Sequence, residues 1–195
     1  GHRAGNYLIF FPSYVYLNEV LATFCVRFPQ FNTVYQTPAM DDAARTGFME
    51  MFETPGSKTE VQETLVGFAI MGGVFGEGID LKGNRLIGVV VVGVGLPQLG
   101  IERDLIKHYF DGELHLDVTP EHDKNHVPGT GFEFAYQYPG INRVLQTAGR
   151  LIRSESDRGI LCLVDNRFNE HRYRRLLPSH WEMEGVKSPV QLNRA

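Results

Sequence analysis

Three short hydrophobic runs, separated by stretches with helical periodicity, limit the folds open to this chain. Residues 7–11, 65–70 and 86–92 are almost continuously apolar, which is typical of strands buried on both faces of a sheet. Residues 14–28, which follow the first run, carry apolar side chains at helical spacing. Strands of this kind that alternate with helices favour a parallel sheet sandwiched by helices. We therefore predict an α/β fold.

The other expected elements have weaker signals. The same patterns predict a strand over 33–36, helices over 41–52 and 101–110, a closing strand over 160–164 and a basic helix over 172–177. A long helical region over 131–154 is predicted to be interrupted at Pro139, whose restricted φ suits the first turn of a new helix. Residues 99–137 include a long polar stretch, and we expect a partly helical insertion there.

Composition narrows the possible partners. A length of 195 residues suits one domain, and 43% hydrophobic residues are enough for a substantial core. The net charge of −4 argues against a free-standing basic nucleic-acid binder, so any nucleic-acid contact must be a local cluster. Two cysteines, Cys25 and Cys162, are too few for a disulfide scaffold and indicate a reducing cytoplasm. The longest apolar run is too short to cross a bilayer, so no membrane partner is expected.

The most specific local signal is a set of polar residues on the predicted helix over 131–154. Gln146, Gly149, Arg150 and Arg153 are spaced i, i+3, i+4 and i+7, so a single helix would present them on one face. A guanidinium in such a place forks onto phosphate oxygens and offsets the charge that develops during phosphoryl transfer. Taken alone, two arginines are as often a solvated basic helix face.

A glycine-rich segment follows the strand over 65–70. It reads Gly72-Gly73-Val74-Phe75-Gly76-Glu77-Gly78-Ile79-Asp80-Leu81. Glycines after a parallel strand allow the backbone to approach a phosphate or a sugar closely. A tight turn is the commoner explanation of such a loop when nothing else supports it.

A third segment, Phe10-Phe11-Pro12-Ser13-Tyr14, joins the first strand to the first helix. Ser13 at a helix N-terminus either caps the helix or offers its hydroxyl group to a DNA phosphate. Tyr14 has a ring that can stack on a base.

Together these three segments resemble motifs VI, V and IV of the XPD/DinG-type superfamily II ATP-dependent DNA helicases. The resemblance covers nearly the whole chain. It implies that residues 1–195 form a single RecA-like domain, the C-terminal (second) motor domain of such a helicase, with the insertion near 99–137. It also implies unwinding or translocation on single-stranded DNA with 5′-to-3′ polarity.

The resemblance further implies roles for individual residues. The implied catalytic residues are Arg150, Arg153 and Gln146; the implied ATP-binding or coupling residues are Glu77, Gly78, Asp80 and Gly149; and the implied DNA-binding residues are Ser13, Tyr14 and Gly73. Gly76 stands where many relatives carry an aromatic residue or a serine, so the sequence predicts no specific side-chain contact from that position.

Two motifs of a complete motor are not in this sequence. It contains no G-x-x-x-x-G-K-[ST] phosphate loop and no Asp-Glu-x-His box for Mg²⁺. We therefore expect no ATP hydrolysis by this chain alone, and an upstream N-terminal domain of the same polypeptide that holds most of the ATP and Mg²⁺. An iron–sulfur cluster needs four cysteine ligands, so the two present here cannot supply one, although the parent protein can have one elsewhere.

Two other classes of function stay open on the residues alone. One is a non-catalytic RecA-like module that binds nucleic acid or protein. The other is a small-molecule enzyme that uses residues 72–78 for a nucleotide cofactor, which is disfavoured because no G-x-G-x-x-G run opens a helix. Four histidines, His108, His115, His122 and His126, have no spacing typical of metal ligands, so we expect surface histidines and no metal site.

Overall fold

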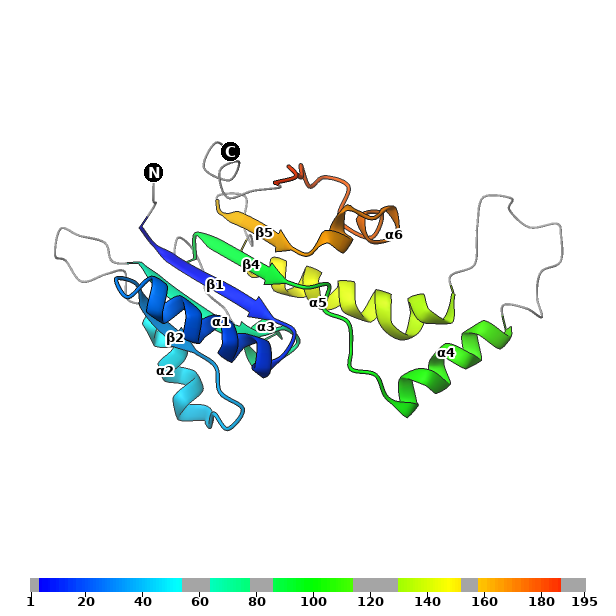
Figure 1. Ribbon diagram of the computed structural model, residues 1–195, viewed down its shortest axis with the longest axis horizontal. Helices are drawn as coiled ribbons and strands as arrows, with labels where there is room; N and C mark the ends of the chain where they lie inside the picture. The colour runs from blue at the N-terminus through cyan, green and yellow to red at the C-terminus, as the bar shows by residue number, and fades with distance from the viewer. Residues whose placement is uncertain (1–3, 54–63, 78–85, 114–129, 152–157, 187–195) are drawn as a thin grey trace.

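The domain is built on five parallel strands. The computed structural model describes residues 4–53, 64–77, 86–113, 130–151 and 158–186. The strands are β1 (Asn6–Phe11), β2 (Asn32–Tyr35), β3 (Leu65–Ile70), β4 (Gly88–Val92) and β5 (Ile160–Val164). They pair in the order β2-β3-β1-β4-β5, and every pairing is parallel (Figure 1). The predicted α/β fold is therefore confirmed.

Helices connect these strands. They are α1 (Tyr14–Arg27), α2 (Asp42–Glu53), α3 (Val74–Glu77), α4 (Ile101–Glu113), the π-helix η1 (Glu133–Gln137), α5 (Tyr138–Ala148), the 3-10 helix η2 (Asn166–Asn169) and α6 (His171–Arg174). The helices predicted over 14–28, 41–52 and 101–110 are confirmed with small shifts at their ends. The basic helix predicted over 172–177 is shorter, because α6 ends at Arg174. Within the described ranges, no helix is long and apolar enough to span a membrane.

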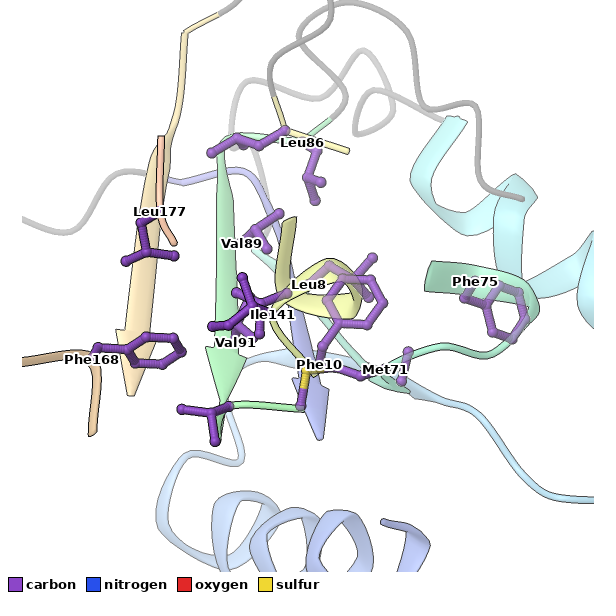
Figure 2. Packing of buried hydrophobic residues seen from close by; sticks show 14 of the residues in the cluster. Leu8, Phe10, Met71, Phe75, Leu86, Val89, Val91, Ile141, Phe168 and Leu177 are labelled. Atoms are coloured by element: carbon purple, nitrogen blue, oxygen red, sulfur yellow. The ribbon is translucent and has the colours of Figure 1, made fainter. Parts of the chain in front are cut away.

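Each face of the sheet has its own hydrophobic cluster. On one face, Leu8 and Phe10 of β1 are fully buried against Ile141 and Val144 of α5. Figure 2 shows Ile141 lying beside Leu8 and Val91 in this cluster. On the other face, Phe11 belongs to a second cluster with Leu17 of α1. Because both faces of β1 are covered, its side chains are apolar at consecutive positions, which is the pattern that the sequence shows.

The start of α5 makes a close backbone contact with the segment that follows β4. A Cβ atom on Gly140 would lie 2.7 Å from the carbonyl oxygen of Val94, and one on Gly95 would lie 2.6 Å from the carbonyl oxygen of Gly140. Gly95 also has a φ of +67°, which is unfavourable for residues with a side chain. Gly95 and Gly140 therefore allow the backbone of α5 to lie directly against the segment that follows β4.

The segment between β4 and α5 leaves the sheet as a helical hairpin, and α4 lies apart from the sheet in Figure 1. Its two described halves are α4 and η1. Phe110 of α4 stacks on Phe134 of η1 with ring centroids 4.2 Å apart, and the Tyr136 hydroxyl donates to Asp104 over 3.0 Å. Burial, together with this hydrogen bond, raises the pKa of Tyr136. Residues 101–113 and 131–137 of the partly helical segment predicted near 99–137 are helical.

The predicted interruption at Pro139 takes a different form. Pro139 does lie in the first turn of α5, as expected. However, the residues flanking η1, Phe132 and Tyr138, have right-handed helical dihedral angles, so the chain stays helical and widens into a π-helix just before the proline. Since proline has no N–H and crowds the preceding turn, a local widening accommodates it without a break.

An ion pair between Asp165 and Arg167 lies directly after β5. Asp165 caps η2 by accepting from the backbone N–H of Arg167 at 2.9 Å, and its two oxygens also accept from the guanidinium of Arg167 at 3.0 and 2.8 Å. The side-chain hydrogen bond from Arg167 holds the pKa of Asp165 below its ordinary value. This fork fixes the turn that leads from the sheet into α6.

Candidate nucleotide and nucleic-acid site

The loops that follow the strands meet at one edge of the sheet, because all strands are parallel. Ser13 and Tyr14 follow β1, and Gly72 and Gly73 follow β3, which is the neighbour of β1. Pairing continues one residue past β3, since the N–H of Met71 donates to the carbonyl of Phe11, the last residue of β1, over 2.9 Å. The fold thus brings the three residues predicted to bind DNA to the same edge.

Ser13 caps α1. Its backbone is extended, with a φ of −154°, and its Oγ accepts from the backbone N–H of Tyr16 at 3.3 Å. Its carbonyl oxygen accepts the first helical bond, from the N–H of Leu17 at 3.0 Å. Capping uses a lone pair of the hydroxyl oxygen, and this leaves the role predicted from the motif, donation to a phosphate, chemically compatible with the cap.

Tyr14 is tied to the end of β3 through the side chain of Gln36, which is only 8% exposed. The amide group of Gln36 donates to the Tyr14 hydroxyl over 3.0 Å. The amide oxygen of Gln36 accepts from the backbone N–H of Ile70 at 2.9 Å. Gln36, directly after β2, therefore joins the start of α1 to the end of β3.

In the sequence, Gln36 has no predicted role beyond the end of a short strand. The signal that would have found it is a polar residue placed directly after a strand, at the edge where parallel sheets bind their ligands. That signal becomes specific only when the neighbouring strand order is known, because Gln36 contacts Tyr14 and Ile70 from far away in the sequence.

The first two glycines of the glycine-rich segment make different contacts. Gly72 has a φ of +70°, and a Cβ atom there would lie 3.0 Å from Nε of Arg143. A Cβ atom on Gly73 would lie 3.4 Å from the amide nitrogen of Gln36. Gly72 therefore requires glycine for its backbone conformation, whereas Gly73 lies beside the amide that holds Tyr14.

Arg143 brings a positive charge to the same edge. Its side chain lies along Gly72 and donates to the carbonyl oxygen of Gly95, at 3.5 Å, in the segment after β4. The residue belongs to the run of sequence that resembles the helicases, but no role was predicted for it. Its position depends on how α5 crosses the ends of β3 and β4, which no local pattern encodes.

Arg150 connects the two most specific segments of the sequence. Its Nε donates to the carbonyl oxygen of Gly76 over 2.9 Å, across 74 residues of chain. Gly76 lies in α3, which packs beside α5. This bond orients the guanidinium plane, and it makes the glycine-rich segment and the arginine-bearing segment neighbours in space.

The predicted helical face that carries Gln146, Gly149 and Arg150 is only partly formed. Gln146 is exposed on α5, but α5 ends at Ala148 and Gly149 caps it. The N–H of Arg150 bonds to the carbonyl of Thr147 at 3.2 Å, a tighter turn than an α-helix makes. The prediction of one continuous helix through Arg150 is therefore wrong, because the chain turns at Gly149, a residue with low helix propensity.

Three of the predicted site residues, Arg153, Gly78 and Asp80, lie outside the described residues. Glu77 is the last residue of α3. Of the four histidines considered above, only His108 is described, and its Nδ1 lies 2.7 Å from the carbonyl oxygen of Asp104 in the preceding turn of α4. No group of three or more His, Cys, Asp or Glu side chains suited to a metal ion occurs in the part of the chain that the structure describes.

A parallel sheet whose glycine-rich loop and arginine-bearing segment meet at one edge fits a helicase C-terminal domain. The helicase C-terminal domain family matches residues 2–184, so the chain belongs to this family. Its sheet and helices are RecA-like, and they resemble the structure of S. tokodaii Xpd4 with a TM-score of 0.50 and 16% sequence identity. That match covers 91% of this chain and 30% of the other.

Similar curated proteins are eukaryotic helicases. The ATP-dependent DNA helicase CHL1 of Kluyveromyces lactis is 27% identical over 94% of this chain and 22% of its own length. The regulator of telomere elongation helicase 1 of Bos taurus is 28% identical over 92% of this chain and 15% of its own length. The chain thus spans 22% and 15% of the lengths of these two relatives.

Proposed function

We propose that this chain is the second motor domain of an ATP-dependent DNA helicase that moves 5′ to 3′ on single-stranded DNA. In this role Arg150, Arg153 and Gln146 are the catalytic residues, and the two arginines act on the transferring phosphoryl group. The observation that carries the proposal is the bond between Arg150 and Gly76. This bond holds a side chain suited to phosphate against the glycine-rich loop, which supports a role for both segments in one nucleotide site.

The DNA track in this proposal runs along the edge where the loops after β1 and β3 meet. Ser13 and Tyr14 provide DNA contacts from the N-terminus of α1, and Gly73 provides one from the loop after β3. The amide ends of a helix N-terminus favour an anionic ligand such as a DNA phosphate. Glu77, Gly78, Asp80 and Gly149 belong, on this proposal, to the path that couples nucleotide to DNA.

The domain boundaries and cofactors are part of the same proposal. Residues 1–195 form one motor domain, and the upstream domain of the same polypeptide holds most of the ATP and the Mg²⁺, because the phosphate loop is not in this sequence. Cys25 and Cys162 are both free thiols, which fits a reducing compartment such as the cytoplasm. An iron–sulfur cluster, where the parent protein has one, would be bound by cysteines outside this chain.

ATP hydrolysis measured with this chain alone and with the full-length protein tests the proposal. We expect no turnover by the 195-residue chain and DNA-stimulated turnover by the full-length protein, because the phosphate-binding half of the site lies outside this chain. Turnover by the chain alone would reveal a complete nucleotide site within it. No turnover by either protein would favour the alternative, a non-catalytic RecA-like module that binds nucleic acid or protein.

A Ser13→Asp variant separates capping from DNA contact. Aspartate caps a helix as well as serine does, so the melting temperature should stay close to that of the unchanged protein. Its negative charge would face a DNA phosphate, so the Kd for single-stranded DNA should rise by on the order of tenfold at low salt. Fluorescence anisotropy with a labelled oligonucleotide measures this.

The matched control is Ser13→Ala, which removes both the cap and the hydroxyl group. It should lower the melting temperature, since an N-cap is worth about 1 kcal/mol. Unchanged DNA affinity in the aspartate variant, together with a lower melting temperature in the alanine variant, would assign Ser13 to capping alone.

A further inference from the structure

We propose that Gln36 is a positioning residue that turns the hydroxyl proton of Tyr14 outward, so that Tyr14 donates a hydrogen bond to a phosphate of the bound DNA strand. The inference rests on the proposed function, in which Tyr14 belongs to the DNA track. It adds Gln36, which directly follows β2, and a defined direction for the hydrogen bond.

Two hydrogen bonds identify the two ends of the Gln36 amide. A backbone N–H group only donates, and that of Ile70 lies 2.9 Å from the amide oxygen of Gln36. The other end is therefore the NH₂ group, which lies 3.0 Å from the Tyr14 hydroxyl oxygen. Because an amide nitrogen does not accept hydrogen bonds, the hydroxyl oxygen of Tyr14 is the acceptor. The hydroxyl proton then points away from Gln36.

The Gln36 amide is held in this orientation. Its side chain is 8% exposed, and its own backbone N–H donates to the carbonyl of Phe68 at 2.8 Å. This bond extends the pairing of β2 with β3 by one residue beyond Tyr35. Rotating the amide by half a turn would bring its NH₂ group against the N–H of Ile70, so two donors would face each other without an acceptor, one of them on the buried Gln36.

The three groups form a chain of hydrogen bonds that runs in one direction. The N–H of Ile70 donates to Gln36, Gln36 donates to Tyr14, and the proton of Tyr14 is left to donate onward. Aligned donors of this kind polarise one another, so the last hydroxyl is a stronger donor than an isolated phenol. A phosphate oxygen accepts but does not donate, so it is the ligand group that this direction suits. Tyr14 is partly exposed at the first position of α1.

A double-mutant cycle in the full-length protein tests the direction of the bond. Tyr14→Phe removes only the hydroxyl group and should weaken binding of a labelled oligo-dT strand on the order of tenfold. In a Gln36→Glu variant, one carboxylate oxygen still accepts from Ile70, but the other now accepts from the Tyr14 hydroxyl. The proton is turned inward, so adding Tyr14→Phe to Gln36→Glu should cost no further affinity.

The pH dependence of the Gln36→Glu variant gives a readout that packing alone would not change. When the introduced carboxylate takes up a proton it becomes a donor and releases the Tyr14 proton. DNA binding by Gln36→Glu should therefore strengthen from neutral to mildly acidic pH more than binding by the Gln36→Glu/Tyr14→Phe double variant. The negative charge of the carboxylate acts on both variants equally, so only the difference between them reports the Tyr14 hydroxyl.

Two further variants keep the test decisive. Tyr35→Phe removes an exposed tyrosine hydroxyl from the residue next to Gln36 and should leave DNA affinity unchanged. If Gln36→Glu does not fold at the assay temperature, Gln36→Met replaces it in the cycle. That side chain has similar length but no amide, so Tyr14→Phe should cost less affinity in the Gln36→Met background than in the unchanged protein.

The outcomes separate this inference from the proposed function. If Tyr14→Phe and Ser13→Asp both leave DNA affinity unchanged, the track along this edge is wrong, and the inference is wrong with it. If Tyr14→Phe weakens binding equally in the unchanged protein and in the Gln36→Glu variant, the track stands but Gln36 does not orient the hydroxyl.

Discussion

Replacing Arg150 with alanine in the full-length protein is expected to lower the kcat of DNA-stimulated ATP hydrolysis by roughly three orders of magnitude or more. Arginines that stabilise the transferring phosphoryl group contribute about 10³–10⁵ to this rate. The KM for ATP should change much less, because the phosphate loop of the upstream domain supplies most of the ground-state binding. Steady-state ATPase kinetics at saturating DNA measure both quantities.

Two companion variants sharpen this test. Arg150→Lys keeps the charge but loses the planar fork and the Nε–H that donates to Gly76, so it should be nearly as inactive as the alanine variant. Arg27→Ala removes an exposed arginine at the last turn of α1 and should keep normal turnover. Near-normal kcat in Arg150→Ala, combined with a lower melting temperature, would make Arg150 a structural link between α3 and α5 and not a catalytic group.

A Gly140→Val substitution should destabilise the domain by about 3 kcal/mol or more. The Cβ atom alone would lie 2.7 Å from the carbonyl oxygen of Val94 and 3.1 Å from the backbone N of Leu96. Both atoms belong to the backbone, so no side chain can rotate away, and α5 would have to move off the end of β4. Urea denaturation of the 195-residue chain, followed by circular dichroism, measures the free energy of unfolding.

Gly47→Ala is the control, because it also replaces a helical glycine with a residue that has a side chain. Gly47 lies in α2 and is exposed, and a Cβ atom there would meet no atom within 4 Å. Alanine should therefore stabilise the domain by about 0.4–1 kcal/mol, because it restricts the unfolded chain without a clash. A Gly140→Val variant as stable as the unchanged chain would show that α5 is not packed against the segment after β4.

The strands and the first helix were predictable because their signals are local. The apolar run predicts both ends of β3, Leu65 and Ile70, correctly. A strand buried on both faces has no polar positions, so its apolar run begins and ends with the strand. The start of α1 was predictable because Ser13 is a typical N-cap. Parallel pairing followed from the alternation of strands and helices, although the strand order did not.

The site was only partly predictable. The segments containing Ser13, Gly73 and Arg150 stood out by their residue types and spacing. The roles of Gln36 and Arg143 did not, because each depends on contacts between distant segments: Gln36 with Tyr14 and Ile70, and Arg143 with Gly72 and Gly95. The end of α5 at Ala148 was also missed, because the polar spacing suggested a longer helix than the turn at Gly149 allows.

The link between Arg150 and residue 76 is made to a main-chain carbonyl, not to a side chain. Every amino acid carries that carbonyl, so the link imposes no choice of residue at position 76. A methyl group there would meet the Ile70 carbonyl oxygen at 3.7 Å and Thr147 Oγ1 at 3.8 Å, which is ordinary contact. Related proteins can therefore diverge at this position while inheriting the same connection between the two halves of the site.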